Sequence, residues 1–530
     1  MSIAMLASAA RAFWGSGMIT QTRPWHLPGM AKARWSTGSS AALPLALAAS
    51  RQGDKVGLVD DRGEISYRQL DDAASRLAAG ISAATELGTE PKIAVMCRNH
   101  RYFLIAMGAA GRLGANLIFL NTEFSGPQLT NMFKNITPDY IIADEEFLPR
   151  LGDAPCPVVA AWTDSALPGQ TTVDQVVARN KPTSVLKPAS TGKVTILTSG
   201  TTGTPKGASR STGPKAVLAI FSTLMIRCGV KAGDTTLIAP PAFHGVGLMG
   251  LHLSLVLGNP IIMRRKFKPE QVLKDIDQYK VRCIVGVPVM YQRMVELPAE
   301  TRDRYDHSTL EMVLSSGSAL RPELFRRFTE AFGPVLYNAY GSSECGFAAI
   351  ATPTDMLEAP GTVGQPSIGI PVQVLRDGAP VSAEESGTIY VGGPQVISQY
   401  MGGGAKQVIN GLVNTGDVGH FDTSGRLYVD GREDDMIVSG GENVYPQEVE
   451  DLLSKHPSIT EAAVVGVEDE QYGQRLVAYV VPRGSQPDTD ELLAYVKDNL
   501  ARYKVPRQVV YLEELPRNAT GKVLRRVLGK

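Results

Sequence analysis

Short apolar runs alternate with helical patterns along most of the chain. Lys92–Cys97 predicts a buried strand, Tyr102–Ala115 a helix, and Asn116–Leu120 the next strand. A second set in the same order follows: Thr235–Ile238, Gln271–Gln278 and Cys283–Gly286. Strand–helix–strand order favours a mostly parallel sheet with helices on both faces. The sequence therefore predicts a large N-terminal α/β body of several subdomains.

The pattern changes near residue 430. Asp430–Asp435 is a charged, turn-rich link, and a short helix is expected from Pro446 to the stop at Pro457. Three strands and one helix follow it: Ala462–Val467, Leu476–Val481, a helix marked by Leu492, Val496 and Tyr503, and Val509–Leu512. We expect a small, mobile C-terminal α+β domain. The predicted division is a leader or surface segment (1–45), the body (46–430), a hinge (431–435) and the small domain (436–530).

Composition narrows the classes of function. A chain of 530 residues favours two or three domains, and its formal net charge of +0 argues against a nucleic-acid partner. The five cysteines are scattered without a C-x-x-C pair, which indicates reduced thiols and neither a disulfide framework nor a zinc site. The apolar run Val246–Leu257 is interrupted by glycine, histidine and serine, so no segment is long enough to cross a bilayer. A cytoplasmic protein is expected.

The first 53 residues contain no Asp or Glu, although they carry several basic residues: Arg11, Arg23, Lys32, Arg34 and Arg51. Such composition is typical of a transit peptide or of a peripheral membrane-surface segment. A mobile leader, or a first helix packed on the body, also fits this composition and is the favoured interpretation. These alternatives stay open, as does a homodimer.

The segment Thr198–Gly207 has the composition of a phosphate-binding loop. A strand-like run, Val194–Leu197, leads into three glycines, four threonines, a serine and Lys206. Glycines let backbone N–H groups approach an anion, hydroxyls add donors, and the lysine adds positive charge. The P-loop of nucleotide hydrolases is excluded because Pro205 precedes the lysine and no Gly-Lys-Ser/Thr leads into a helix. A flexible polar turn remains the alternative from composition alone.

Thr198–Gly207 closely resembles the signature of the adenylate-forming superfamily, which contains acyl-CoA synthetases, peptide-synthetase adenylation domains and luciferases. Further motifs of that superfamily follow in order: Ser316–Leu320, Tyr340–Glu344, Thr415–Asp417, Gly431–Arg432 and Pro516–Lys522. Ser343 departs from the usual threonine but keeps the hydroxyl. The resemblance covers residues 50 to 530 and implies ATP, Mg²⁺ and CoA as cofactor and co-substrates. The implied nucleotide-binding residues are Thr198, Ser199, Gly200, Thr201, Thr202, Gly203, Thr204, Lys206, Gly317, Ser318, Ala319, Tyr340, Gly341, Ser342, Ser343, Asp417, Arg432 and Lys522.

The resemblance also implies roles. Lys522, Glu344 and Thr198 would be catalytic, with Glu344 and Thr198 holding Mg²⁺, which prefers oxygen ligands. Tyr340 would stack on the adenine, while Asp417 and Arg432 would bind the ribose. Asp434 would be the hinge on which the small domain turns between adenylation and thioester formation. The residues that would line the CoA channel are Ser439, Gly440, Gly441 and Glu442.

The acid substrate would contact the segment Pro241–Gly250, with His244, Gly245 and Met249 as the acyl-binding residues. From Thr235 to Pro269 the chain has no Asp or Glu. An amino-acid substrate needs a buried carboxylate for its ammonium group, so an apolar acid is expected. Gly245, Gly247 and Gly250 would leave room for a chain, which favours a medium or long fatty acid over an aryl acid. His244 would line or gate the pocket, or be a core histidine.

The main prediction is a fatty-acid–CoA ligase that forms acyl-AMP and then acyl-CoA. The open alternatives are an aryl-CoA ligase, a fatty acyl-AMP ligase that hands the acyl group to a carrier protein, and a luciferase-like oxygenase. A catalytically silent acyl- or nucleotide-binding relative is the non-enzyme alternative. It would be expected to lack Lys522 or Glu344, and both are present.

Overall fold

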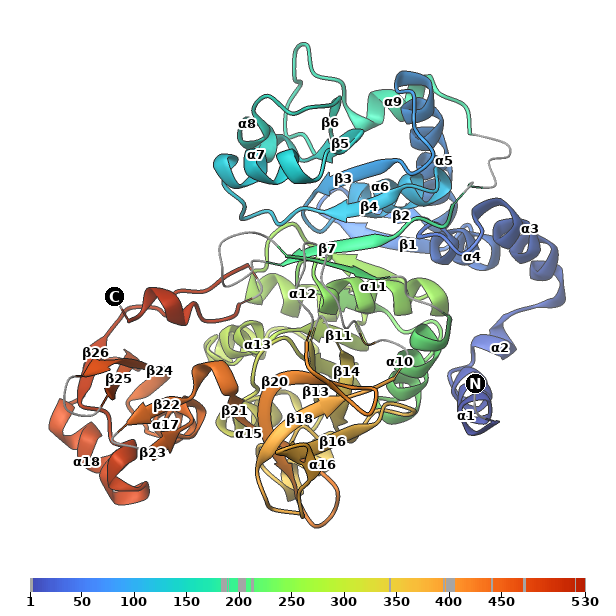
Figure 1. Ribbon diagram of the computed structural model, residues 1–530. Coiled ribbons are helices and arrows are strands. Elements are labelled where there is room, and N and C mark those ends of the chain that lie inside the picture. The colour runs from blue at the N-terminus through green and yellow to red at the C-terminus, as the bar shows by residue number, and fades with distance from the viewer. Residues whose placement is uncertain are drawn as a thin grey trace. The chain divides into compact units, whose positions relative to one another are not determined.

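The computed structural model describes residues 3–182, 188, 190–198, 206–210, 214–342, 345–393, 396, 406–439, 442–469, 473–519 and 521–529. The chain forms two compact units. The first comprises Met1–Gly286, Leu297–Val313 and Gln399–Ala405, and the second Val287–Glu296, Leu314–Ser398 and Lys406–Lys530. Each is described below by itself (Figure 1).

One sheet of the first unit has the order β6-β5-β3-β4-β7-β8. Its strands are β3 (Lys92–Met96), β4 (Asn116–Phe119), β5 (Tyr140–Ala143), β6 (Val158–Ala160), β7 (Val194–Thr198) and β8 (Lys206–Arg210). Neighbours pair in parallel except β7 and β8, which form an antiparallel hairpin with Thr198 opposite Lys206. The strand that follows Lys206 agrees with the exclusion of a P-loop helix.

A second run of five strands in this unit has the order β11-β9-β10-β1-β2. These are β1 (Val56–Asp60), β2 (Gly63–Ser66), β9 (Thr236–Ile238), β10 (Ile261–Met263) and β11 (Cys283–Gly286). All neighbours are parallel except β1 and β2. The predicted parallel α/β body is therefore confirmed in the first unit. The predicted helices are α6 (Arg101–Arg112) and α12 (Pro269–Tyr279).

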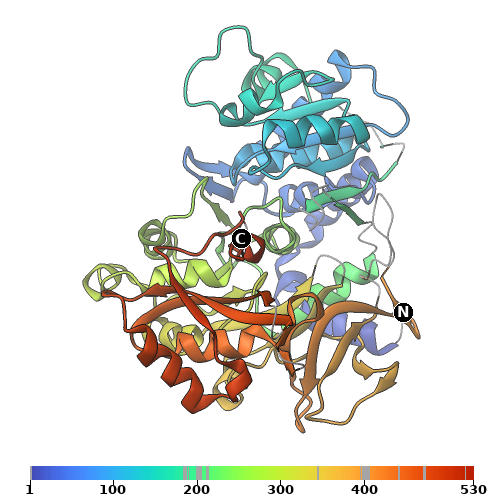
Figure 2. The same cartoon turned by 60° about the vertical axis from the view of Figure 1, so that its left-hand side comes forward.

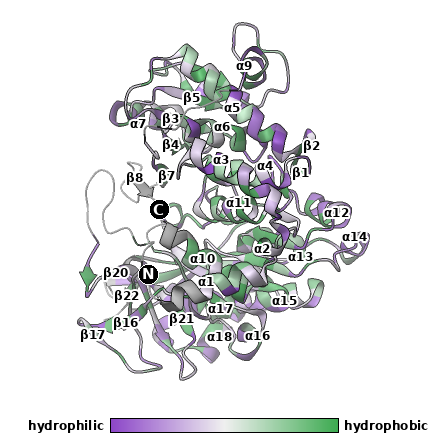
Figure 3. Cartoon of the chain, turned by 90° about the vertical axis from the view of Figure 1, so that its right-hand side faces the viewer, coloured by the Kyte–Doolittle hydropathy of each residue, from purple (hydrophilic) through white to green (hydrophobic). Residues whose placement is uncertain are grey.

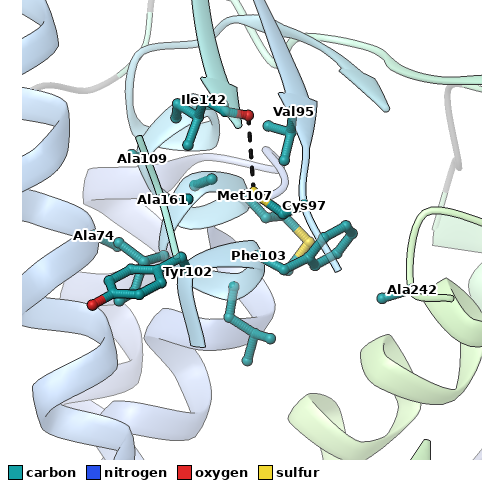
Figure 4. Packing of buried hydrophobic residues seen from close by; sticks show 14 of the residues in the cluster. Ala74, Val95, Cys97, Tyr102, Phe103, Met107, Ala109, Ile142, Ala161 and Ala242 are labelled. Carbon is teal, nitrogen blue, oxygen red and sulfur yellow. Dashed lines mark hydrogen bonds between the residues drawn. The ribbon is translucent and has the colours of Figure 1, made fainter. Parts of the chain in front are cut away.

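The core of the first unit lies between these strands and their helices. The main covering helices are α4 (Leu43–Gln52), α5 (Tyr67–Ala84), α6 and α11 (Gly245–Leu257). Phe103 of α6 stacks on Phe119 of β4 with ring centroids 4.8 Å apart. Figure 4 shows Phe103 among the buried residues around Cys97, whose thiol lies 3.8 Å from the Ile142 carbonyl oxygen. The five cysteines are all free.

Residues 3–37 form helices that pack on the first unit. They are α1 (Ile3–Gly15), α2 (Met18–Gln21) and α3 (Leu27–Thr37). α1 contacts α10 (Pro214–Arg227), the Ser16 carbonyl accepts the Ala232 N–H at 2.8 Å, and Gln21 donates to the Ala232 carbonyl at 2.7 Å. Of the alternatives for this segment, packing on the body is the one observed. Within the described part of the chain, every helix is too short or too polar to cross a bilayer.

The second unit contains the helices α13 (Pro288–Val295) and α15 (Pro322–Phe332), followed by β-structure that the sequence patterns did not predict in detail. β13 (Leu336–Ser342), β14 (Gly346–Ala351) and β15 (Gln365–Pro366) pair antiparallel. A further antiparallel sheet has the order β17-β16-β18-β20-β19, with β21 beside β20. Its strands are β16 (Val372–Arg376), β17 (Ala379–Pro380), β18 (Gly387–Val391), β19 (Val408–Ile409), β20 (Leu412–Phe421) and β21 (Leu427–Arg432).

The last hundred residues form the predicted α+β fold. Its elements are β22 (Ile437–Ser439), β23 (Glu442–Val444), α17 (Pro446–Ser454), β24 (Ile459–Asp469), β25 (Gly473–Pro482), α18 (Thr489–Asn499) and β26 (Gln508–Tyr511). Tyr503 lies beyond α18, in a short 3₁₀ turn (Arg502–Lys504). β22 and β23 were missed because each is only three residues long.

Alternate residues of β24 belong to two different cores. Ala462 and Val464 pack with α17 and α18, whereas Ala463 and Val465 pack with the segment that contains Leu515 and Leu528. Figure 2 shows the two helices together on one face of this orange-red sheet. The period of two along the strand explains the division.

Candidate functional site

Asp417 lies on β20 within a group of polar side chains from three strands. Tyr340 of β13 donates its hydroxyl to Asp417 Oδ2 at 2.6 Å, and Arg432 of β21 donates to Oδ1 at 3.2 Å. Arg432 is the register partner of Asp417 in the β20–β21 pair. The structure therefore brings together three predicted nucleotide-site residues that are far apart in sequence.

The backbone around Asp417 is fixed by its neighbours. Thr415 accepts the Asp417 N–H at 3.1 Å and donates its hydroxyl to the Ile389 carbonyl at 2.8 Å. Gly416 has φ of 80°, a conformation that favours glycine. Lys406, which the sequence reasoning missed, donates to the Thr415 carbonyl at 2.9 Å. A lone lysine outside any motif gave no signal for this role.

Burial is the largest influence on the Asp417 carboxyl and raises its pKa above the usual value. The Tyr340 hydrogen bond and the charges of Arg432, Lys522 and Lys406 oppose that shift. Burial also raises the pKa of Tyr340, so its hydroxyl stays protonated as the donor. The influence of Lys522 on Asp417 means that the ammonium group lies within electrostatic range of this cluster.

Lys522 itself is exposed and is presented by a tight turn. The side-chain oxygen of Asn518 accepts the backbone N–H of Lys522 at 2.9 Å. The backbone N–H of Asn518 donates to the Lys522 carbonyl at 3.0 Å. Arg517 donates to the Gly521 carbonyl at 2.6 Å and to Glu461 at 2.8 Å. Gly521 has φ of 77°, and an added Cβ would lie 2.5 Å from Val289 Cγ1. The turn therefore requires glycine, and the lysine is held on a defined backbone.

The predicted adenine segment follows β12 (Met312–Ser315) as an exposed loop. Ser316 is buried and donates its hydroxyl to the Ala339 carbonyl at 2.8 Å, which ties the loop to β13. Gly317 has φ of 87°, Ser318 is half-buried and Ala319 is exposed. The loop is thus joined to the strand that carries Tyr340.

Gly341 and Ser342 complete β13 beside β14. The pairing shifts register between Tyr340 and Gly341, and a Cβ on Gly341 would lie 1.9 Å from the Gly346 carbonyl oxygen. Ser342 accepts the Cys345 N–H at 3.3 Å. The glycine of this motif is therefore required by the strand pairing, independently of any nucleotide.

The predicted acyl segment belongs to the first unit and is held by Asn99. The Asn99 side chain donates to the Pro240 carbonyl at 2.8 Å and accepts the Ala242 N–H at 2.7 Å. Asn99 precedes α6, whose N-cap residue His100 donates from Nε2 to the Asp144 carboxylate at 2.9 Å. The sequence reasoning missed Asn99, although its place just after strand β3 could have drawn attention to it, since parallel strands end near binding loops.

His244 stands at the N-cap of α11, and its Nε2 atom is sealed from solvent and has no hydrogen-bond partner among the described residues. Its ring lies 4.5 Å from that of Phe243. Burial lowers the pKa of His244 to about 4, so the imidazole is neutral at physiological pH. A neutral ring nitrogen left without a protein partner can hydrogen-bond a bound molecule.

The glycines of this segment do not all leave open space. A Cβ on Gly247 would lie 2.5 Å from the Pro241 carbonyl oxygen, and one on Gly250 would lie 2.9 Å from Val285 Cγ2. Both glycines therefore allow α11 to pack closely on its neighbours. Only Gly245 of the three has no atom of a described residue within 4 Å of an added Cβ, and Met249 is half-buried. The expectation that Gly247 and Gly250 make room for an acyl chain is therefore wrong, and the same expectation for Gly245 stays a prediction.

Several predicted residues lie outside the described part. They are Ser199, Gly200, Thr201, Thr202, Gly203 and Thr204 of the phosphate loop, Ser343 and Glu344, and Gly440 and Gly441. Thr198 and Lys206 end the hairpin strands on either side of the phosphate loop, and Ser439 pairs with Glu442 across β22 and β23. Asp434 lies in the 3₁₀ turn Glu433–Asp435, between β21 and β22. The roles expected of these residues stay predictions.

Known proteins match this chain over most of its length. The AMP-binding enzyme family matches residues 45–401, and the C-terminal domain of AMP-binding enzymes matches residues 448–522. Indoleacetate–CoA ligase of Aromatoleum aromaticum is 33% identical over 473 residues, covering 87% of this chain and 92% of that protein. 2-Succinylbenzoate–CoA ligase of Geobacillus kaustophilus is 34% identical over 483 residues, covering 90% and 95%.

Solved structures agree with these matches. The o-succinylbenzoate CoA synthetase of Bacillus subtilis, in complex with its acyl-adenylate intermediate, has a TM-score of 0.79 and 27% identity, covering 92% of this chain and 98% of that one. ATP-bound MatB from Rhodopseudomonas palustris has a TM-score of 0.80 and 25% identity, with coverage of 92% and 98%. The motif order, the fold and both family matches lead to one conclusion: the chain belongs to the AMP-binding enzymes of the adenylate-forming superfamily.

Proposed function

We propose that this protein is an AMP-forming acid–CoA ligase whose substrate is an apolar carboxylic acid that carries an aryl group. The observation that carries the ligase assignment is the joining of Tyr340, Asp417 and Arg432 into one cluster within electrostatic range of Lys522. A silent relative would have no reason to keep a lysine from the far end of the chain at this cluster.

The first half-reaction would be attack of the acid carboxylate on the α-phosphate of ATP, with pyrophosphate leaving. Lys522 would neutralise charge that builds up on the carboxylate and the α-phosphate. Asp417 is already a hydrogen-bond acceptor for two protein donors, and its second lone pairs would accept the ribose hydroxyls. Tyr340 and Arg432 would hold that carboxylate in place and so orient the nucleotide.

Mg²⁺ is expected to accompany ATP and to neutralise phosphate charge when bound. The residue expected to hold it is Glu344, supported by Thr198.

The second half-reaction would be attack of the CoA thiol on the acyl-adenylate, which releases AMP. Asp434 would allow the C-terminal domain to turn, which would withdraw Lys522 and bring the β22–β23 hairpin to the thiol's path. The position of Asp434 in a single 3₁₀ turn between two strands supports a hinge, because few hydrogen bonds hold such a turn.

An aryl-bearing acid is favoured by two observations. Indoleacetate–CoA ligase and the 2-succinylbenzoate–CoA ligases, which resemble this chain, act by name on aromatic acids. The packing roles of Gly247 and Gly250 also remove most of the argument for a long chain. The fatty-acid preference is therefore not supported, and the aryl-CoA alternative takes its place. His244, whose Nε2 has no partner among the residues that the structure describes, would hydrogen-bond a polar group on the acid.

The test is pyrophosphate release with ATP, Mg²⁺ and CoA across a panel of acids, with acyl-CoA measured by chromatography. The panel runs from acetate to oleate and includes benzoate, indoleacetate and 2-succinylbenzoate. We expect the highest kcat/KM with an aryl-bearing acid. A best rate with a straight-chain fatty acid would reject the substrate proposal while leaving the ligase proposal intact.

Two other outcomes would reject the ligase proposal. Acyl-AMP that accumulates without acyl-CoA would point to an acyl-AMP ligase that serves a carrier protein. Absence of pyrophosphate release with every acid would point to a silent binding protein.

A further inference from the structure

Three of the four tryptophans lie within residues 14–35, and all three are exposed. Trp14, Trp25 and Trp35 have 66%, 70% and 67% of their surface accessible, whereas Trp162 has 5%. Ile19 and Leu27 in the same stretch are also exposed. Tryptophan exposed to water is costly, so three on one short stretch indicate a surface that is covered in use.

The helices of this stretch are packed on the protein, so the three tryptophans are exposed on a folded surface. Ala9 and Ala12 of α1 are buried, as are Ala33 and Thr37 of α3. On α3, Leu27 and Trp35 are eight residues apart and share the face opposite Ala33 and Thr37, as the helical period requires. Figure 3 faces α1, α2 and α3, which lie along this side of the first unit.

Every charged side chain on this surface is basic. Arg11, Arg23, Lys32 and Arg34 are exposed, and none of them joins an ion pair with a described residue. The first acidic residue of the chain is Asp54. The surface therefore combines interfacial aromatic side chains with uncompensated positive charge.

We propose that α1, α2, α3 and the turn that carries Trp25 form a peripheral binding surface for an anionic lipid bilayer. Tryptophan favours the interface between headgroups and acyl chains, and basic side chains are attracted to anionic headgroups. The surface would bind the first unit peripherally to a bilayer, in which apolar acids dissolve. No segment that crosses the bilayer is needed for this binding.

A second copy of the chain is the less favourable occupant. A two-fold dimer through this surface would place the same basic patch on both sides of the interface. Four positive side chains per copy would then face one another without an acid to pair with, and like charges at an interface oppose association. Anionic lipid carries the complementary charge.

The experiment is vesicle flotation of the full chain without nucleotide. We expect binding to vesicles of equal phosphatidylglycerol and phosphatidylcholine at 0.1 M salt, and at least about tenfold weaker binding to phosphatidylcholine alone or at 1 M salt, because charge attraction is lost. Acyl chains brominated in the vesicles should quench the three exposed tryptophans, which tests insertion in the unaltered protein.

Two triple variants test the residues. Trp14→Ala/Trp25→Ala/Trp35→Ala and Arg23→Glu/Lys32→Glu/Arg34→Glu should each weaken binding by about tenfold or more, with pyrophosphate release in solution unchanged. The matched controls are Leu357→Ala, another exposed apolar side chain, and Lys134→Glu/Arg179→Glu/Lys181→Glu, three exposed basic residues elsewhere on the first unit. These controls should bind as the unaltered protein does.

The proposal is overturned if the unaltered protein does not bind anionic vesicles, or if the control variants weaken binding as much as the two test variants. It is also overturned if light scattering shows a dimer that the tryptophan variant dissolves while no vesicle binding occurs. That result would assign the surface to a second copy of the chain.

Discussion

The cluster around Asp417 and the segment around His244 solve opposite problems. At Asp417, the carboxylate is already held by two protein donors, with Tyr340 of β13 on one oxygen and Arg432 of β21 on the other. At His244, the chain has no acid from Thr235 to Pro269, and Nε2 has no hydrogen-bond partner in the part of the chain that the structure describes. The first is organised before anything binds, whereas the second leaves one hydrogen bond for the molecule that arrives.

This difference separates what the reaction shares from what the substrate requires. A nucleotide has the same phosphates and ribose in every member of the family, so its contacts can be built in advance. The acid varies between members, so its segment is defined by shape and by a single polar atom. Substitutions in the two regions should therefore alter different kinetic constants.

The substitution with the largest expected effect is Lys522→Ala, which should slow adenylation. Loss of one charge-stabilising group commonly lowers the rate by about 10²–10³-fold, and we expect that loss in adenylation. Thioester formation from a supplied acyl-adenylate should be far less affected, because Lys522 would be withdrawn in that step. Pyrophosphate release and acyl-CoA formation, measured separately, distinguish the two.

Arg526→Ala, which removes an exposed basic side chain four residues away, is the control for charge alone. Equal losses in both half-reactions of Lys522→Ala would contradict the assignment of the lysine to adenylation.

Asp417→Asn tests the preorganised side of the comparison. The neutral Asn amide has one acceptor oxygen, so it cannot replace both hydrogen bonds that the charged carboxylate accepts from Tyr340 and Arg432. We therefore expect the free energy of unfolding to fall by about 1–3 kcal/mol. The KM for ATP should rise while the KM for the acid stays the same. Asp422→Asn is the matched control, because Asp422 accepts from Arg426 at 2.7 Å beside the same two strands but outside the cluster. A rise in the KM for the acid instead would remove the separation between the regions.

Gly250→Ala and Gly245→Ala sharpen the description of the acyl segment. At Gly250 the new methyl would crowd Val285 and Ile238, and overpacking of this kind costs about 1–3 kcal/mol of stability. At Gly245 there is free space, so the melting temperature should stay the same and the KM for bulky acids should rise. Thermal unfolding and acid-panel kinetics measure both. Unfolding of Gly245→Ala at lower temperature would show that its space is not open.

The smallest effect concerns the pH dependence of His244. Its pKa of about 4 in the folded protein lies below the ordinary value of 6.5, so the unfolded chain takes up a proton first as pH falls. Stability is therefore full above pH 6.5 and is lost progressively between 6.5 and 4. His244→Gln removes this contribution and should reduce the loss at pH 5 by about 1–2 kcal/mol. Urea unfolding midpoints at pH 7 and pH 5 measure this loss of stability in both proteins. An equal loss in the unaltered protein and in His244→Gln would mean that His244 is not held as a buried, neutral imidazole.

The sequence predicted secondary structure best where a local hydrophobic pattern was compatible with only one kind of element. Cys283–Gly286 was expected and is found as β11, and the helix from Pro446 begins where the proline allows it. The order of the motifs predicted that Tyr340, Asp417 and Lys522 belong together; Tyr340 is found hydrogen-bonded to Asp417, and the charge of Lys522 acts on the pKa of Asp417. Residue spacing alone could not have done so, because 182 residues separate Tyr340 from Lys522.

Other features depend on contacts that no local pattern encodes. Asn99 and Pro240 are 141 residues apart, and only the fold makes their hydrogen bond. Gly250 and Gly245 look alike in sequence, but one faces Val285 and the other faces open space. The short antiparallel strands β22 and β23 are set by cross-strand partners and have too few residues to show a period.

Because the two faces of β24 pack into two different cores, the register of this strand in the C-terminal domain is strongly determined. A shift of this strand by one residue would send Ala462 and Val464 to the core of Leu515, and Ala463 and Val465 to the core of α17. Both cores would then be mispacked at once, and no partial compensation in one could repair the other. A wrongly threaded domain would therefore be far less stable than a correct one, which keeps Lys522 on a single backbone position each time the domain folds.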